Sequence, residues 1–163
     1  MSRPEKQLRD LVQRGYRFAL SLTHDGIQAE DLLQDAWFAV LRRQGPWNRG
    51  YLFTTIRNRF IDQLRRRAVF DPLPLTESPE AQDDEVTFDD VDVASLNGNL
   101  ELALGRLSGD ERAVLYLFSV EEYTAQAIAD LLNWPRGTVL SLVHRAKTKL
   151  RRMASDNAEA MKP

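Results

Sequence analysis

The chain has 163 residues, no cysteine and two histidines, and its formal net charge at pH 7 is −2. This length allows one domain or two small ones, and the missing cysteines exclude disulfides, zinc fingers and thiol catalysis. No stretch is long and apolar enough for a transmembrane helix, and the first residues lack the apolar core of a signal peptide. We therefore expect a cytoplasmic protein with no metal and no cofactor.

The charge is distributed very unevenly along the chain. Residues 1–70 carry 13 Arg and Lys against 7 Asp and Glu, residues 71–101 carry 10 acids and no base, and residues 102–163 carry 9 bases against 7 acids. The acidic segment has no helical period before Leu100, so burial would not repay the entropy of ordering it. We predict a flexible acidic linker over residues 70–98. It serves either as a solvated spacer or as a negatively charged strand in a basic groove, on a partner or on this protein.

The basic N-terminal part has the apolar periodicity of three helices. The first helix is expected around residues 8–22, the second from about 28 to 43 and the third from about 49 to 67, with a short loop at 44–48. The apolar side of the second helix would consist of Leu32, Leu33, Ala36, Trp37, Val40 and Leu41. In the third helix, Phe53 and Phe60 lie on the apolar stripe and are expected in the core. The arginines of this helix, together with polar groups and rings, suit single-stranded nucleic acid.

Residues 123–152 have the pattern of a helix-turn-helix. Thr124 is placed to cap a first short helix, Asn133 to end it in a left-handed conformation, and Pro135 to begin a second helix. The second helix would bury Val139, Val143, Ala146 and Leu150 on one face. Its other face carries Gly137, Ser141, His144, Arg145, Thr148 and Arg152. The periodicity alone fits either a DNA-binding helix-turn-helix or an ordinary helical hairpin with a solvated basic face.

Two further motifs accompany this pattern. The sequence AEDLLQDAW spans residues 29–37 and GYLFTTIRNRFIDQLRRR spans residues 50–67, while Ser108 and Glu111 form a capping box before the helix pair. In this order, with the acidic segment between them, the motifs resemble the bacterial sigma factors of the extracytoplasmic-function (ECF) type. The resemblance covers residues from about 10 to 152.

This resemblance implies an all-α fold of two small helical domains joined by the linker. A region 2-like domain would occupy residues 1–69 and a region 4-like helix-turn-helix domain residues 99–155, with a disordered tail at 156–163. The expected partners are core RNA polymerase, through its clamp helices and flap, promoter DNA, and an anti-sigma factor. The chain itself would catalyse nothing.

The resemblance also assigns candidate site residues. The residues expected to contact core polymerase are Asp31, Gln34 and Asp35. Those expected at the minus-ten element are Trp47, Asn48, Thr55, Asn58, Arg59 and Arg65. Those expected at the minus-thirty-five element are Arg136, Thr138, Ser141, His144 and Arg145, with Lys147 and Lys149 for phosphates.

The chain departs from the family pattern at two places. Leu140 and Leu142 stand where family members commonly have basic residues, and each missing cation would remove about one contact to DNA. The loop at 44–48 is short for a family whose corresponding loop captures a flipped base. We therefore also considered a sigma-like decoy or adaptor that binds an anti-sigma factor. A classical operator-binding repressor would leave residues 29–67 unexplained.

Overall fold

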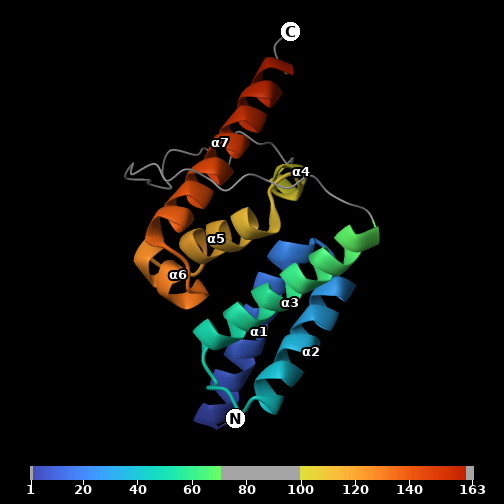
Figure 1. Cartoon of the computed structure of the whole chain (residues 1–163), viewed down its shortest axis with the longest axis vertical. Coiled ribbons are helices and arrows are strands. Elements are labelled where there is room, and N and C mark those ends of the chain that lie inside the picture. The colour runs from blue at the N-terminus through green and yellow to red at the C-terminus, as the bar shows by residue number, and fades with distance from the viewer. Residues whose placement is uncertain (1, 71–99, 161–163) are drawn as a thin grey trace. The chain divides into compact units, whose positions relative to one another are not determined.

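The computed structural model describes residues 2–70 and 100–160, and every regular element in these ranges is a helix (Figure 1). The chain divides into two compact units, which we describe separately. Unit 1 contains helices α1 to α3 and unit 2 contains helices α4 to α7. None of the described helices is both long and apolar enough to cross a membrane.

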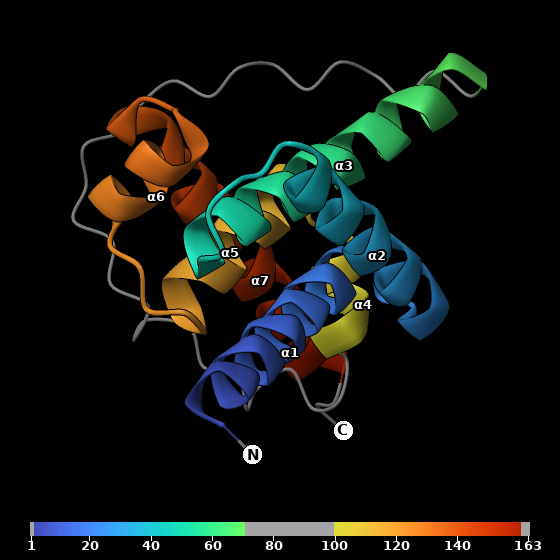
Figure 2. The ribbon, with the colours of Figure 1, turned by 90° about the horizontal axis from the view of Figure 1, so that it is seen from below.

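Unit 1 is a bundle of three helices, α1 (Arg3–Thr23), α2 (Gly26–Arg42) and α3 (Arg49–Phe70), each packed against the other two (Figure 2). Its core contains the rings of Phe18 and Phe53, whose centroids lie 5.0 Å apart. Gly15 lets α1 approach closely, because a Cβ at this position would lie 2.9 Å from side-chain atoms of both Leu33 and Leu52. Both predicted core phenylalanines, Phe53 and Phe60, are confirmed as buried.

Local signals set the ends of the helices in unit 1. The side chain of Ser2 and that of Glu5 form a reciprocal capping box at the start of α1. Asp25 caps α2 by accepting hydrogen bonds from the backbone N–H groups of Ile27 and Gln28. The Asn48 carboxamide oxygen accepts from the Tyr51 N–H at 2.8 Å, which places Asn48 at the start of α3.

Unit 2 contains α4 (Leu100–Gly105), α5 (Gly109–Ser119), α6 (Ala125–Leu132) and α7 (Arg136–Ala160). Helices α4, α5 and α6 all pack against α7, which is the longest helix of the unit (Figure 1). A core cluster joins residues of α4 and α5 to the middle of α7. This cluster consists of Ala103, Leu107, Leu115, Ala146 and Leu150.

The caps and the turn of the helix-turn-helix agree with the prediction, whereas the second helix begins one residue later than predicted. Thr124 caps α6 by accepting from the Ala127 N–H, and Asn133 ends α6 with a left-handed φ of 55°. Helix α7 begins at Arg136, one residue after Pro135. The predicted capping box of Ser108 is also present at the start of α5.

Of the predicted segments, the C-terminal tail differs from the structure, and the linker lies almost entirely outside the described residues. Helix α7 continues to Ala160, so the prediction of a disordered tail is wrong for residues 156–160. Met153 and Ala154, which lie just before this extension, pack against the core cluster of unit 2. The predicted linker falls outside the described residues except for Phe70, which ends α3.

Candidate nucleic-acid interface

A polar groove in unit 1 brings four of the predicted minus-ten residues together. The groove has a volume of about 400 Å³ and is formed by the middle of α3 and the end of α2. Its lining residues are Ala39, Arg43, Thr55, Arg57, Asn58, Arg59, Ile61, Asp62 and Arg65. Four arginines against one aspartate give this groove a positive charge, which suits a nucleic-acid backbone.

The polar side chains in the groove already make hydrogen bonds that limit what they offer a ligand. The Thr55 hydroxyl donates to the Tyr51 carbonyl at 2.8 Å, so its remaining lone pairs face a ligand as acceptors. The Asn58 carboxamide oxygen accepts from the Arg57 guanidinium at 3.1 Å, which leaves the Asn58 amide to donate. The groove therefore offers hydrogen-bonding groups as well as cations.

The other two predicted minus-ten residues, Trp47 and Asn48, lie at a different hollow. This second hollow has a volume of about 570 Å³ and lies between the first turns of α1 and the loop before α3. Its lining residues are Pro4, Gln7, Leu8, Asp10, Leu11, Trp47, Asn48 and Arg49. The predicted set of six is thus divided between two hollows of the same unit.

The predicted polymerase-binding residues form one exposed face of α2. Asp31, Gln34 and Asp35 are all exposed, and their spacing of three and four residues places them on one side of the helix. Two large apolar side chains lie on the same face, Ile27 with 74% and Phe38 with 58% of its surface exposed. Apolar groups exposed among polar ones are typical of a protein-binding surface.

The sequence prediction missed this apolar component. Leu41 was assigned to the buried side of α2 but is 46% exposed, so that assignment is wrong. It lies about 150° around the helix from the centre of the buried stripe. The spacing of Ile27, Asp31, Gln34, Phe38 and Leu41, alternately four and three residues, is the signal that identifies a second helix face.

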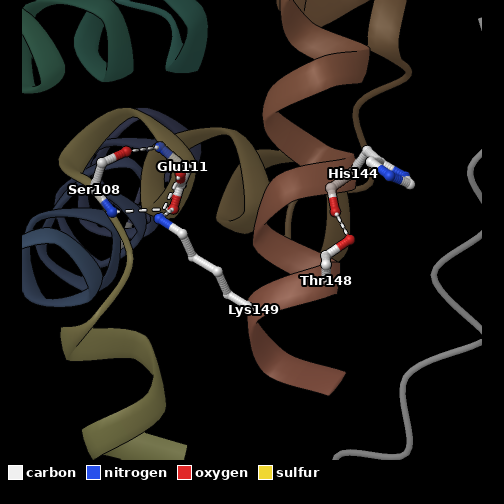
Figure 3. A network of polar contacts seen from close by, with 5 residues as sticks. All are labelled: Ser108, Glu111, His144, Thr148 and Lys149. Atoms are coloured by element: carbon white, nitrogen blue, oxygen red, sulfur yellow. Dashed lines mark hydrogen bonds and ion pairs between the residues drawn. The ribbon is translucent and has the colours of Figure 1, made fainter. Parts of the chain in front are cut away.

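The predicted minus-thirty-five residues lie on the first half of α7, with differing exposure. Arg136 is exposed at the first residue of the helix, whereas Thr138, His144 and Arg145 are partly exposed. Ser141 is buried. In Figure 3 the His144 imidazole points away from the contact that Lys149 makes with α5.

The two lysines predicted to reach phosphates are placed differently from that prediction. Lys147 is only 2% exposed, and its Nζ atom lies 6.0 Å from the centre of the Phe118 ring. Lys149 donates to both carboxylate oxygens of Glu111 at 2.9 Å (Figure 3). Both cations therefore connect α7 to α5, and we do not include them among the proposed DNA contacts.

The Glu111 carboxylate is the centre of a polar network at the start of α5. It accepts from the Ser108 N–H at 3.1 Å as well as from Lys149, and it is buried. Burial lowers the pKa of the adjacent Arg112, while the negative charge of Glu111 raises it. These interactions attach the start of α5 to the middle of α7, beyond the recognition half of that helix.

Leu140 and Leu142, which replace basic residues of the family pattern, are both buried. Leu140 is 9% exposed and Leu142 is 7% exposed. On the helical wheel Leu140 lies about 20° from Lys147, two turns further along α7. Neither leucine contributes an exposed apolar patch.

Two helical units, one with a basic groove and the other with a helix-turn-helix, define a protein that binds nucleic acid. Residues 6–69 match the family described as Sigma-70 region 2, and residues 97–150 match Sigma-70, region 4. The ECF RNA polymerase sigma factor SigL of Mycobacterium tuberculosis is 34% identical over 83% of this chain and 80% of its own length. The RNA polymerase sigma factor CarQ of Myxococcus xanthus is 30% identical over 85% of this chain and 82% of its own length.

A solved structure shares the fold. The sigma factor RpoE from Bartonella quintana, crystallised with the anti-sigma factor NepR, aligns with a TM-score of 0.66 and 24% identity, covering 93% of this chain and 96% of its own. The family matches and the relatives together show that the chain belongs to the sigma-70 family, as a sigma factor of the ECF type. Its function is that of a sigma factor, which directs RNA polymerase to promoters.

Proposed function

We propose that this sigma factor uses three separate surfaces, one for core polymerase and one for each promoter element. The observation that carries the proposal is the basic groove of unit 1, which collects Thr55, Asn58, Arg59 and Arg65 from a sequence motif into one hollow. This groove would hold the melted minus-ten strand, with its arginines on the backbone and its polar groups at base edges.

The exposed face of α2 would bind the clamp helices of core polymerase. Asp31, Gln34 and Asp35 supply the polar contacts of this interface, and Phe38 and Ile27 add apolar area that is desolvated on binding. We propose no catalytic step for the chain itself, and its association with polymerase places it in the cytoplasm.

The first half of α7 would read the minus-thirty-five element in the major groove. Arg136, Thr138, His144 and Arg145 form the proposed contact set, and Ser141 is left out because it is buried. Leu140 and Leu142 replace two basic residues that are common in the family, and Lys147 and Lys149 contact α5. Because few cations are left for phosphates, the affinity for duplex DNA should depend only weakly on salt concentration.

Run-off transcription with purified core polymerase and genomic promoter fragments tests the proposal. Arg59→Ala should abolish or strongly reduce open-complex formation while leaving holoenzyme assembly intact. Asp31→Ala together with Asp35→Ala should weaken assembly itself. Absence of transcripts from every genomic fragment, with normal assembly, would contradict the proposal.

An anti-sigma factor is the second proposed partner. Support comes from the fold shared with a sigma factor that was crystallised with an anti-sigma factor. Pull-down of the native protein from cell extract distinguishes the two activities. Recovery of a small anti-sigma protein without polymerase subunits would favour the adaptor function over promoter recognition.

A further inference from the structure

The loop between α2 and α3 is short but fixed along its backbone. Gln44 adopts a left-handed conformation with φ of 50°, and the Gly45 N–H donates to the Val40 carbonyl at 3.1 Å. A Cβ on Gly45 would lie 2.3 Å from a ring carbon of Tyr51, so this close packing requires glycine. At the other end of the loop, Asn48 caps α3. The backbone path of this loop is therefore set before any ligand binds.

The side chain at the tip of this loop is held by a ring on α2. Trp47 is 52% exposed, and its ring centroid lies 4.7 Å from that of Trp37 in an edge-on arrangement with an interplanar angle of 62°. Aromatic pairs in this geometry attract each other beyond the effect of burial alone. Because a tryptophan side chain on an exposed loop has several rotamers, this contact selects one orientation of the Trp47 indole.

That orientation makes Trp47 a wall of the second hollow. Helix α1 contributes the apolar side chains of Pro4, Leu8 and Leu11 and the polar ones of Gln7 and Asp10, while Asn48 and Arg49 add polar groups from the loop and α3. The Asp10 carboxylate is paired with Arg14 at 2.9 Å. A planar aromatic ring beside apolar carbon and a cation is suited to an unpaired nucleobase and its phosphate. Trp37 does not line this hollow, so any effect it has on the ligand passes through Trp47.

We propose that Trp37 is a positioning residue, which acts through Trp47 to set the base preference of the loop between α2 and α3. The proposal rests on the proposed contact of Trp47 with the minus-ten strand. Trp37 lies about 80° around α2 from the centre of the polymerase-binding face, at its edge beside Leu41 and more than about 100° from Asp31 and Asp35. Its effect should therefore appear in base preference and not in assembly with polymerase.

The test measures base preference with assembled holoenzyme. The ligands are four pools of fluorescein-labelled single-stranded octadeoxynucleotides, random except at one position that is fixed as A, C, G or T. This position is moved along the octamer, and the ratio of dissociation constants between the best and the worst pool is the preference. All variants carry Trp134→Phe, so the two indoles of unit 1 are the only tryptophans of the sigma factor. The sigma factor with Trp134→Phe alone is the reference.

Trp47→Leu should lower this preference by about tenfold, because stacking on one aromatic ring contributes about 1–3 kcal/mol per base and its loss should fall mainly on the preferred base. Trp37→Leu should lower it by about fivefold, and Trp37→Phe, which keeps a ring edge, should restore it to within about twofold. The double variant should resemble Trp47→Leu alone, because the two residues act as one unit. On the free sigma factor, acrylamide quenching of Trp47 fluorescence should be greater in Trp37→Leu than in Trp37→Phe, because Trp47 is the one tryptophan left in both of these variants.

Three results would overturn the positioning role. One is an unchanged base preference in Trp37→Leu together with a lost preference in Trp47→Leu. Another is a double variant whose loss of preference equals the product of the two single losses. The third is an equal loss of affinity for every pool together with a lower melting temperature, which is the result of a purely structural role. If the reference protein itself shows no base preference, the proposed contact of Trp47 with DNA fails as well, and this outcome is distinct from the other three.

Discussion

At the scale of single residues, two ion pairs of the structure have very different surroundings. Glu111 is buried and accepts hydrogen bonds from Lys149 and from the Ser108 backbone, whereas Asp10 and Arg14 form an exposed pair within α1. Exposed pairs contribute little, because water competes for both charges. Loss of a buried, multiply bonded carboxylate removes a helix cap and a connection between helices at once.

Glu111→Ala should therefore lower the free energy of unfolding of unit 2 by about 2 kcal/mol. Asp10→Ala, the matched control, should change the stability of unit 1 by less than about 0.5 kcal/mol. Urea denaturation followed by circular dichroism measures both changes. Equal effects of the two substitutions would show that the network at the start of α5 is not a stabilising contact.

Two glycines give a second contrast between residues. At Gly45 a Cβ would meet the Tyr51 ring at 2.3 Å, while at Gly105, at the end of α4, no heavy atom lies within 4 Å of the added Cβ. Gly45→Ala should destabilise unit 1 by about 1–3 kcal/mol, because the loop or the Tyr51 ring must move. Gly105→Ala should be neutral or stabilising by up to about 1 kcal/mol. Thermal melts of both variants provide the measurement, and a neutral Gly45→Ala would show that the loop yields easily.

At the scale of helices, sequence periodicity predicted the positions of α1, α2 and α3 and the caps of α5 and α6, because these features depend on neighbours along the chain. The exposed face of α2 was harder to recognise. Its apolar members, Ile27 and Phe38, look like core residues until the packing of α1 and α3 shows which side of α2 is already covered.

The candidate site was predicted unevenly for the same reason. Thr55, Asn58, Arg59 and Arg65 come from one helix, so their gathering in one groove follows from helical spacing. The sequence does not distinguish Lys147 and Lys149 from lysines that face solvent. Only the tertiary structure shows that Lys147 lies over the Phe118 ring and that Lys149 pairs with Glu111. A partner that lies 38 residues away in sequence leaves no local signal.

The face of α2 makes a prediction that separates binding from folding. Ile27→Ser and Phe38→Ser remove exposed apolar groups, so each should change the stability of unit 1 by less than about 0.5 kcal/mol. Each should nevertheless weaken binding to core polymerase by about tenfold, as expected for apolar groups near the centre of an interface. Leu20→Ser, an exposed apolar position on α1, is the control and should leave the affinity unchanged. Competition against a labelled sigma factor measures the affinity, and normal binding by both α2 variants would exclude this face.

At the scale of the whole molecule, the two units have separate cores, and the proposed contacts to the two promoter elements are divided between them. The core of unit 1 includes Phe18 and Phe53, and that of unit 2 includes Leu115 and Leu150. Substitutions at distant sites with no shared partners usually have additive effects on free energy. The proposed contacts to the minus-ten and minus-thirty-five elements should therefore contribute independently to binding of one promoter.

Arg59→Ala in the groove of unit 1 and Arg145→Ala on α7 test this independence. Each should weaken the complex of holoenzyme with promoter DNA by about tenfold, and the double variant by about a hundredfold, with additivity within about 0.5 kcal/mol. Arg59→Ala should remove the preference for the minus-ten sequence only, and Arg145→Ala that for the minus-thirty-five sequence only. Filter binding on promoters mutated in either element supplies both readouts. A double variant no weaker than either single one would mean that the two units recognise the promoter as a coupled pair, because loss of one contact would then release the other.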